Sequence, residues 1–188
     1  MRIVLASESP FRKRALDLLG VAYETCPSRI DEKGIRDSDP AELTRKLAEA
    51  KARKVAGDCT DAVIVSGDAV VAKQGRIFEK PWDREEAREF LGQLSGSEFQ
   101  FITSLAVFHA PTGRMRSVVE ASTIRFRPLL EREIQAYIRK YPVQKFAGAL
   151  ESDAVLLFAE GISGSYNFVT ALPVSRLVVL LREQGVDV

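Results

Sequence analysis

Cysteine and histidine are scarce in this chain of 188 residues, which has two cysteines and one histidine. Cys26 and Cys59 lack the spacing of metal ligands and are too few for a disulfide framework, so we expect reduced thiols in a cytoplasmic protein. The single histidine, His109, precedes a turn-forming Ala-Pro-Thr-Gly run. One histidine at a turn argues against a histidine-dependent catalytic triad and against a histidine-rich zinc site.

An excess of one charge sign and long apolar runs are also absent. The 27 lysines and arginines nearly balance the 26 aspartates and glutamates, which leaves a formal net charge of +1. This balance argues against stable nucleic-acid binding, although a local basic cluster could still hold a small anion. No apolar run approaches the roughly 20 residues that span a bilayer, so we expect no membrane partner.

The residues that are present form patterns typical of an α/β protein. Apolar runs predict strands over residues 2–6, 21–26, 62–66, 99–108, 115–126 and 155–159. Helical spacing and capping residues predict helices that begin after Ser9, Asp39 and Asp83, a helix over 129–141, and a last helix from Pro173. Because the two long central strands form a hairpin, we expect a mixed sheet flanked by helices. The length suits one bilobed domain over residues 1–188.

Two segments have the residue types that bind anions. The first strand leads into Ser7-Glu8-Ser9-Pro10-Phe11-Arg12-Lys13-Arg14, so hydroxyls and three cations surround a helix N-terminus, where free N–H groups favour phosphate. A capped helix with a solvated basic face explains the same pattern. Lys51 lies within the second predicted helix and Lys80 precedes a proline in an extended turn; both are candidate phosphate ligands or solvated lysines.

Two acidic positions are candidates for catalysis and metal binding. Asp31-Glu32 lies in a polar loop, and paired carboxylates of this kind either are solvated or bind a hard cation such as Mg²⁺. Gly67-Asp68 directly follows the buried run 62–66, and ligands of open α/β sheets bind outside the carboxyl ends of strands. Asp68 is therefore the best candidate to orient a metal or to take a proton from water, with a capping turn aspartate as the alternative.

Together these positions fit a polyphosphate with a divalent cation. The chain has no Walker-type Gly-x-x-x-x-Gly-Lys-Ser/Thr run, so the site is not a P-loop. It also lacks a covalent nucleophile with an adjacent base. Water is the expected nucleophile, and the expected reaction is metal-assisted hydrolysis of a phosphoanhydride.

At this level of detail the chain resembles the Maf nucleoside triphosphate pyrophosphatases, from its first strand to its last helix. The matching pieces, in order, are Leu5 to Arg12, Asp31-Glu32, Leu47 to Ala52, Gly67-Asp68, Glu79-Lys80-Pro81, Leu94-Ser95-Gly96, Ala147-Gly148 and Leu172-Pro173. The resemblance implies a bilobed fold with a central cleft, like that of the inosine triphosphate pyrophosphatases. It also implies hydrolysis of a nucleoside triphosphate between its α and β phosphates, with Mg²⁺ or Mn²⁺.

The resemblance assigns roles to individual residues. Asp68 is the expected proton acceptor, and Glu32 joins it near the metal. The expected phosphate-binding residues are Ser7, Ser9, Arg12, Lys51 and Lys80. The positions that match the family's specificity residues are Phe11, Ala69 and Asp153.

At Phe11 and Asp153 the chain resembles the branch of the family that hydrolyses 7-methyl-GTP, which implies 7-methyl-GTP or a related modified nucleotide as the substrate. An aromatic face can stack on a cationic base, and a carboxylate accepts the N–H groups of guanine. The segment Gly164 to Val169 instead resembles the branch of the family that hydrolyses dTTP and UTP. A third reading is a non-enzymatic nucleotide-binding regulator of cell division. A homodimer is compatible with all three.

Overall fold

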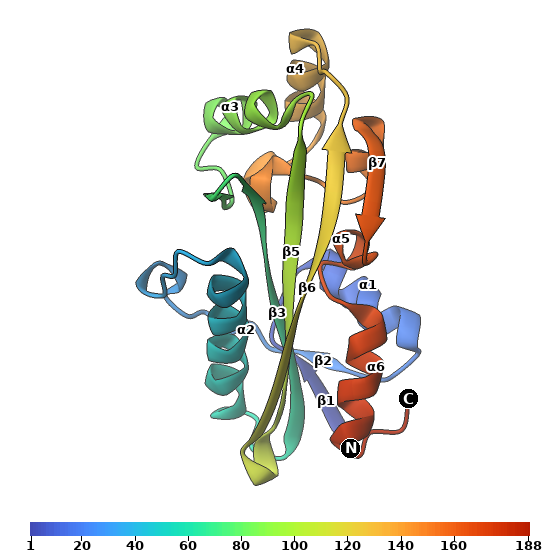
Figure 1. Cartoon of the computed structure of the whole chain (residues 1–188). Helices are drawn as coiled ribbons and strands as arrows, with labels where there is room; N and C mark the ends of the chain where they lie inside the picture. Colours follow the sequence, from blue (N-terminus) through green and yellow to red (C-terminus); the bar gives the residue numbers. More distant parts are fainter.

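A mixed seven-stranded sheet runs through the computed structural model, which describes residues 1–188 (Figure 1). The strands are β1 (Arg2–Leu5), β2 (Glu24–Thr25), β3 (Ala62–Lys73), β4 (Arg76–Phe78), β5 (Glu98–His109), β6 (Arg114–Phe126) and β7 (Ala159–Gly164). Their order is β2-β1-β3-β5-β6-β7, and β4 pairs with β3. β1 is parallel to β2 and β3, whereas all other pairs are antiparallel.

Six α-helices cover parts of this sheet. They are α1 (Pro10–Leu19), α2 (Pro40–Ala56), α3 (Arg84–Leu94), α4 (Glu131–Lys140), α5 (Asn167–Thr170) and α6 (Val174–Glu183). Short 3-10 helices connect them: η1 (Glu32–Gly34), η2 (Ala110–Thr112), η3 (Val143–Lys145), η4 (Ala147–Ala149) and η5 (Ala154–Leu157). None of the helices combines the length and the apolar composition that crossing a membrane requires.

Alternate residues of β3 pack against opposite layers of helices in the lower lobe, which contains both termini (Figure 1). Val63 and Val65 belong to a core with residues of α1 and α6. Ala62 and Ile64 face the other way and pack with residues of α2. This two-residue period continues along the strand, so that Asp68 lies on the α2 side of the sheet.

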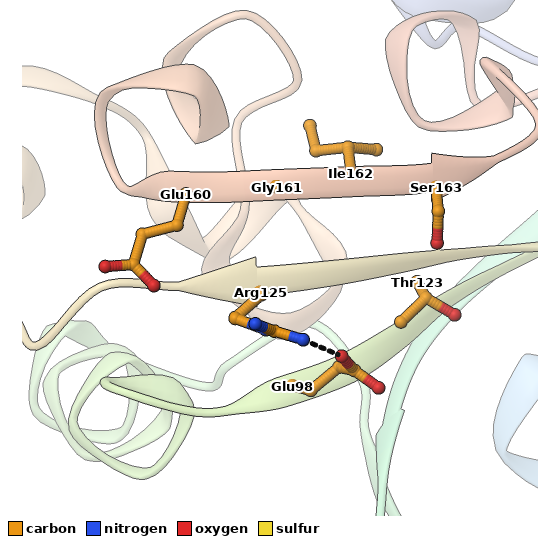
Figure 2. A pocket seen from close by; sticks show the side chains of 7 residues that line it. All are labelled: Glu98, Thr123, Arg125, Glu160, Gly161, Ile162 and Ser163. Carbon is orange, nitrogen blue, oxygen red and sulfur yellow. Dashed lines mark hydrogen bonds and ion pairs between the residues drawn. The ribbon is translucent and has the colours of Figure 1, made fainter.

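A separate core fills the upper lobe. Residues of β3, β5 and β6 pack there against α3, α4 and the segment from η3 to η5, and Phe99, Phe126 and Phe158 form edge-to-face pairs. On the opposite face Val70, Ala72 and Ile102 pack against residues of α2, whereas Glu98, Gln100 and Arg125 are exposed. Figure 2 shows a shallow polar hollow on this face, where Arg125 pairs with Glu98 at 3.1 Å. The long strands β3, β5 and β6 thus connect two lobes that have different cores.

One edge of β3 is left without a strand neighbour in the middle. β1 pairs with β3 as far as Val65, and β4 pairs with the same edge only from Val71. Residues 66–70 therefore have β5 on one side and no strand on the other. Asp68 lies at the centre of this gap.

The expected α/β fold, with a mixed sheet, flanking helices and two lobes, is confirmed. Three local predictions were wrong. Asp68 does not end a strand, because β5 pairs with β3 from Val63 to Ala72 and keeps it extended. The run 155–159 is mostly the 3-10 helix η5, and β7 begins only at Ala159. The strand expected over 21–26 is reduced to Glu24–Thr25.

Candidate active site

A buried ion pair between α2 and β3 lies at the gap in the sheet. Nζ of Lys51 lies 2.6 Å from Oδ1 of Asp68 and 3.0 Å from Oε1 of Glu32. The Lys51 and Asp68 side chains are 7% and 10% exposed, whereas Glu32 is about half-exposed at 47%. Two carboxylates and one ammonium from three distant parts of the chain thus meet at one point.

The backbone of Asp68 is held by its partner strand. Its N–H donates to Oγ of Ser104, the residue paired with it in β5, and the Ser104 hydroxyl donates to the carbonyl of Thr44 in α2. Gly67 allows this close packing. A Cβ atom there would lie 2.6 Å from the carbonyl oxygen of Ser104 and would collide with the side chain of Leu172.

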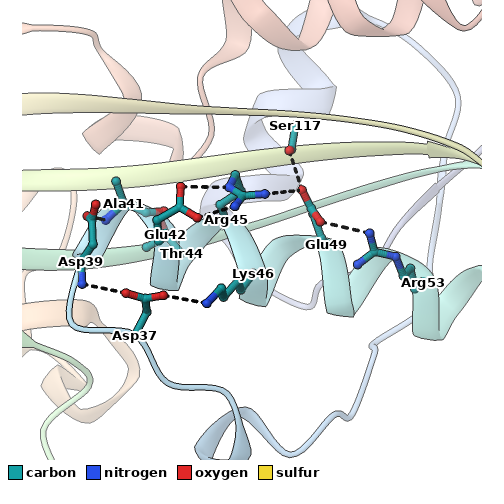
Figure 3. Close-up of polar contacts among 10 residues, drawn as sticks. All are labelled: Asp37, Asp39, Ala41, Glu42, Thr44, Arg45, Lys46, Glu49, Arg53 and Ser117. Carbon is teal, nitrogen blue, oxygen red and sulfur yellow. Dashed lines mark hydrogen bonds and ion pairs between the residues drawn. The ribbon is translucent and has the colours of Figure 1, made fainter.

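A network of ion pairs fixes α2, the helix that contributes Lys51 (Figure 3). Asp39 caps the helix by accepting from the N–H of Ala41, as predicted. Glu49 pairs with Arg45 and Arg53 and accepts a hydrogen bond of 2.7 Å from Ser117 in β6. The hydrogen bond between Glu49 and Ser117 therefore fixes α2 to the sheet close to Lys51, which pairs with Asp68.

Arg12 and Ser7 lie together where β1 leads into α1. Nη1 of Arg12 lies 3.3 Å from Oγ of Ser7, which also accepts from the N–H of Ser9. The predicted capping bond from the Ser9 side chain is absent. Ser9 instead lines a cavity together with Arg12 and Asp68.

That cavity, here called the aromatic hollow, lies between α1 and the upper lobe. It is lined by Ser9, Phe11, Arg12, Asp68, Ala69, Lys80, Phe101, Lys145, Phe146, Ala147, Leu150, Ser152 and Ala171. Phe11 and Phe146 meet edge to face, with ring centroids 5.6 Å apart. An apolar wall with a few polar groups is the usual composition of a small-molecule site.

A second cavity, here called the charged hollow, lies on the α2 side of β3. It is lined by Glu32, Lys33, Arg36, Leu47, Asp68, Ala69, Val70, Glu79 and Lys80. Asp68, Ala69 and Lys80 line both hollows. The two hollows therefore form one cleft that passes around the open edge of β3, with Asp68 where they join.

Gly148 places the segment with Lys80 at this cleft. Its N–H donates to the carbonyl of Glu79 at 2.9 Å. Gly148 has a φ of +60°, and a Cβ atom would lie 2.6 Å from the Val71 side chain, so only glycine fits without a shift. The Ala147-Gly148 pair singled out in the sequence thus holds Lys80 near Phe146.

The charges in the cleft influence one another. Burial alone raises the pKa of Glu32, but the ion pair with Lys51, with Lys80 and Arg12 nearby, outweighs it and holds this pKa below its ordinary value. Burial lowers the pKa of Arg12, while the carboxylates of Asp68 and Glu32 act in the opposite direction. The cations at the junction are thus partly compensated by acids of the same cleft.

Most of the predicted site residues lie at this cleft. Ser9, Phe11, Arg12, Glu32, Asp68, Ala69 and Lys80 line it, Lys51 contacts two of them, and Ser7 contacts Arg12. Asp153 does not line either hollow. Its side chain is 66% exposed and pairs with Arg14 at 3.0 Å.

Several cleft residues were not predicted. In the aromatic hollow these are Phe101, Lys145, Phe146, Leu150 and Ser152, and in the charged hollow they are Lys33, Arg36 and Glu79. Phe146 directly precedes Ala147-Gly148, so this motif could have drawn attention to it. Glu79 likewise precedes Lys80 in a matching motif, whereas the others belong to segments whose place at the cleft depends on the packing of the two lobes.

The donor set suits a shared metal ion rather than a metal held by protein alone. No cluster of three or more His, Cys, Asp or Glu side chains in the structure could hold a metal ion. Glu32 and Asp68 nevertheless converge on one cation, Nζ of Lys51. Mg²⁺ in phosphate-binding sites typically takes one or two carboxylates and completes its coordination with water and substrate oxygens.

Comparison with known proteins gives matches over nearly the whole chain. A dTTP/UTP pyrophosphatase of Carboxydothermus hydrogenoformans is 37% identical over 186 residues, which cover 98% of this chain and 100% of that protein. One of Syntrophus aciditrophicus is 36% identical over 185 residues, covering 98% and 90%. A solved HAM1 protein from Coxiella burnetii aligns with 97% of this chain and 99% of that chain, at 15% identity and a TM-score of 0.49.

The family described as "Maf-like protein" matches residues 2–184. The expected motifs from the first strand to the last helix lie within this range, and most of them meet at the cleft. The chain belongs to the Maf-like family.

Proposed function

We propose that this protein hydrolyses a nucleoside triphosphate between its α and β phosphates, giving a nucleoside monophosphate and pyrophosphate. The observation that supports this most directly is the position of Asp68, a buried carboxylate where an aromatic hollow joins a charged one. Relatives with the name dTTP/UTP pyrophosphatase support the same reaction.

The shape of the cleft suggests how such a substrate lies. The base enters the aromatic hollow, and the phosphates pass around the open edge of β3 toward Lys33, Arg36 and Lys80 in the charged hollow. Arg12, with Ser7 and Ser9, binds phosphate oxygens at the junction, because hydrogen bonds between a guanidinium and a phosphate are stronger than those between neutral groups. The α–β bridge then lies next to Asp68.

Asp68 is the proton acceptor in this reaction. A water oxygen forms a bond to a phosphorus of the bridge, the bond from that phosphorus to the bridging oxygen breaks, and Asp68 takes the proton of the water. General-base catalysis of this kind contributes typically 10²–10⁴-fold to the rate. Lys51 compensates the negative charge of Asp68 and Glu32 when the substrate is absent.

A divalent cation, Mg²⁺ or Mn²⁺, is part of the proposal. Glu32 and Asp68 would hold it together with phosphate oxygens of the substrate. When bound, such an ion neutralises charge that develops on the phosphates. Lys33, Arg36 and Lys80 supply further positive charge on the side of the β and γ phosphates.

The base proposed for the aromatic hollow is 7-methylguanine or a related modified base. Phe11 and Phe146 offer aromatic faces, and a cation over such a face gains about 0.5–2 kcal/mol. Ala69 leaves room for the base beside Asp68. The names of the relatives favour a second candidate, dTTP and UTP.

A nucleotide panel with matched variants tests the function. Purified protein, Asp68→Asn and Asp61→Asn are incubated with 7-methyl-GTP, GTP, dTTP and UTP in Mg²⁺ or Mn²⁺, and products are separated by ion exchange. We expect equimolar monophosphate and pyrophosphate, a loss of at least about 100-fold in Asp68→Asn, and no change in Asp61→Asn, an exposed residue paired with Arg2. Release of orthophosphate alone, or full activity of Asp68→Asn, would contradict the proposal; faster turnover of dTTP and UTP would select the second candidate.

A further inference from the structure

Ser152 and Asp153 are neighbours in the chain but face different surroundings. Ser152 lines the aromatic hollow and is 6% exposed. Asp153 is largely exposed and makes an ion pair of 3.0 Å with Arg14 of α1. Only one of the two side chains is therefore in a position to meet a molecule in the hollow.

Hydrogen bonds on both sides of Ser152 hold this arrangement. The N–H of Glu151 donates to Oη of Tyr137 at 2.7 Å, and the Tyr137 hydroxyl donates to the carbonyl of Ala149 at 3.0 Å. The Glu151 carboxylate accepts from the N–H of Ala154 at 2.7 Å. Turning the Asp153 side chain toward the hollow would break its ion pair with Arg14.

The hydroxyl of Ser152 forms no hydrogen bond within the chain. Nε2 of Gln184 is the only fully enclosed side-chain polar atom that lacks a hydrogen-bond partner. Oγ of Ser152, which also lacks a partner, is therefore not fully enclosed, and Ser152 lines the aromatic hollow. A hydroxyl that is largely removed from water and has no hydrogen-bond partner is unfavourable. A ligand in the hollow can satisfy it as donor or as acceptor.

The neighbours of this hydroxyl are those of a base site. Phe11 and Phe146 form the aromatic wall, and Leu150 and Ala147 continue the apolar surface beside Ser152. Flat apolar walls hold the faces of a ring, while one well-placed polar group distinguishes its edge. In the proposed binding mode the phosphates lie at the junction of the two hollows and beyond it, next to the cations around Asp68.

We infer that Ser152 recognises the edge of the base through a hydrogen bond of its hydroxyl. Asp153 instead attaches α1 to the upper lobe through its ion pair with Arg14. This inference rests on the proposed function, because it needs a nucleotide in the cleft. It differs from the expectation drawn from the sequence, in which Asp153 had the reading role.

The test compares Ser152→Ala with Asp153→Asn and the unmodified protein. kcat/KM is measured for 7-methyl-GTP, GTP, dTTP and UTP, and for ribose 5-triphosphate, which has phosphates but no base. Because Ser152→Ala only removes a hydroxyl from a cavity wall, we expect it to fold. We expect it to lower kcat/KM for the preferred nucleotide by about tenfold, to reduce the differences among bases, and to leave ribose 5-triphosphate unchanged.

The outcomes separate the inference from the function. If the unmodified protein hydrolyses none of these compounds, the proposed function fails and the inference fails with it. If nucleotides are hydrolysed but Ser152→Ala keeps the same order and ratios of substrates, the inference alone is overturned. A shift of base preference in Asp153→Asn without one in Ser152→Ala, or an equal loss on ribose 5-triphosphate, would also overturn it.

Discussion

Nζ of Lys51 contacts the carboxylates of both Asp68 and Glu32, at 2.6 and 3.0 Å, and it is buried with Asp68. One ammonium thus compensates two acids from different segments of the cleft wall. A buried charge that loses its partner is far more costly than an exposed one. The pair therefore links the stability of the chain to the residues proposed for its chemistry.

Lys51→Met should destabilise the protein by about 3 kcal/mol at pH 7, because it keeps the apolar stem but leaves two carboxylates without their cation. Urea unfolding measures the loss. The control is Lys54→Met on the same helix, where an exposed lysine lies 4.0 Å from Asp58 and the expected change is below about 1 kcal/mol. Equal losses in the two variants would contradict the role given to Lys51.

Gly67→Ala should destabilise the chain by about 1–3 kcal/mol, because the new methyl group meets Leu172 and the Ser104 carbonyl. It should also reduce hydrolysis, since Asp68 is the next residue. Gly92→Ala is the control. Apart from its chain neighbours and the backbone of α3 itself, no atom lies within 4 Å of the place that its methyl group would take, and a helical alanine gains about 0.5–1 kcal/mol over glycine. Shifts of the denaturation midpoint in opposite directions are expected, and equal shifts would contradict the packing described for Gly67.

Gln184→Met should stabilise the protein by about 1 kcal/mol. Nε2 of Gln184 is buried without a hydrogen-bond partner, and methionine has a similar shape without the amide. Gln144→Met, at an exposed position in η3, should change stability by less than about 0.5 kcal/mol. Thermal unfolding of both variants checks this, and a lower melting temperature for Gln184→Met would refute it.

Glu133→Gln should remove a pH-dependent part of the stability. The hydrogen bonds from Arg127 lower the pKa of Glu133 to about 2, from an ordinary value of 4.5. Since the folded value is the lower one, the ionised carboxylate stabilises the fold fully above about pH 4.5, and this contribution disappears as the pH falls toward 2. The difference in unfolding free energy between the unmodified protein and Glu133→Gln should be constant from about pH 7 to 5 and shrink below 4.5. A difference that stays constant to about pH 3 would speak against the bond.

Local chemistry predicted much of the fold. Helix starts at Pro10, Pro40 and Arg84 follow from the proline or capping aspartate in front of them. The predictions failed where long-range pairing decides the conformation. β3 remains extended through Gly67 and Asp68 because β5 accompanies it, and a polar pair after an apolar run looks like a strand end without that partner.

In the candidate site, too, local motifs predicted some residues, and long-range packing decided the position of others. Residues in compact motifs, such as Arg12, Asp68 and Lys80, were predicted and lie at the cleft. Ser152 was not, because its role depends on which of two adjacent side chains faces inward. The hydrogen bonds that hold this segment join Glu151 and Ala149 to Tyr137, which lies fifteen positions before Ser152, and no local pattern encodes them.

Continuous strands cross the joint between the two lobes, where many two-part enzymes have flexible linkers. A linker lets the parts separate widely, whereas a hydrogen-bonded ladder resists bending and allows only a modest change of angle. Entry of a ligand must then depend mainly on movements of the loops and side chains at the rim of the cleft. The carboxylate of Asp68, at the middle of the ladder, would stay in register while the walls around it adjust, so the proposed proton acceptor is held by the most rigid part of the cleft.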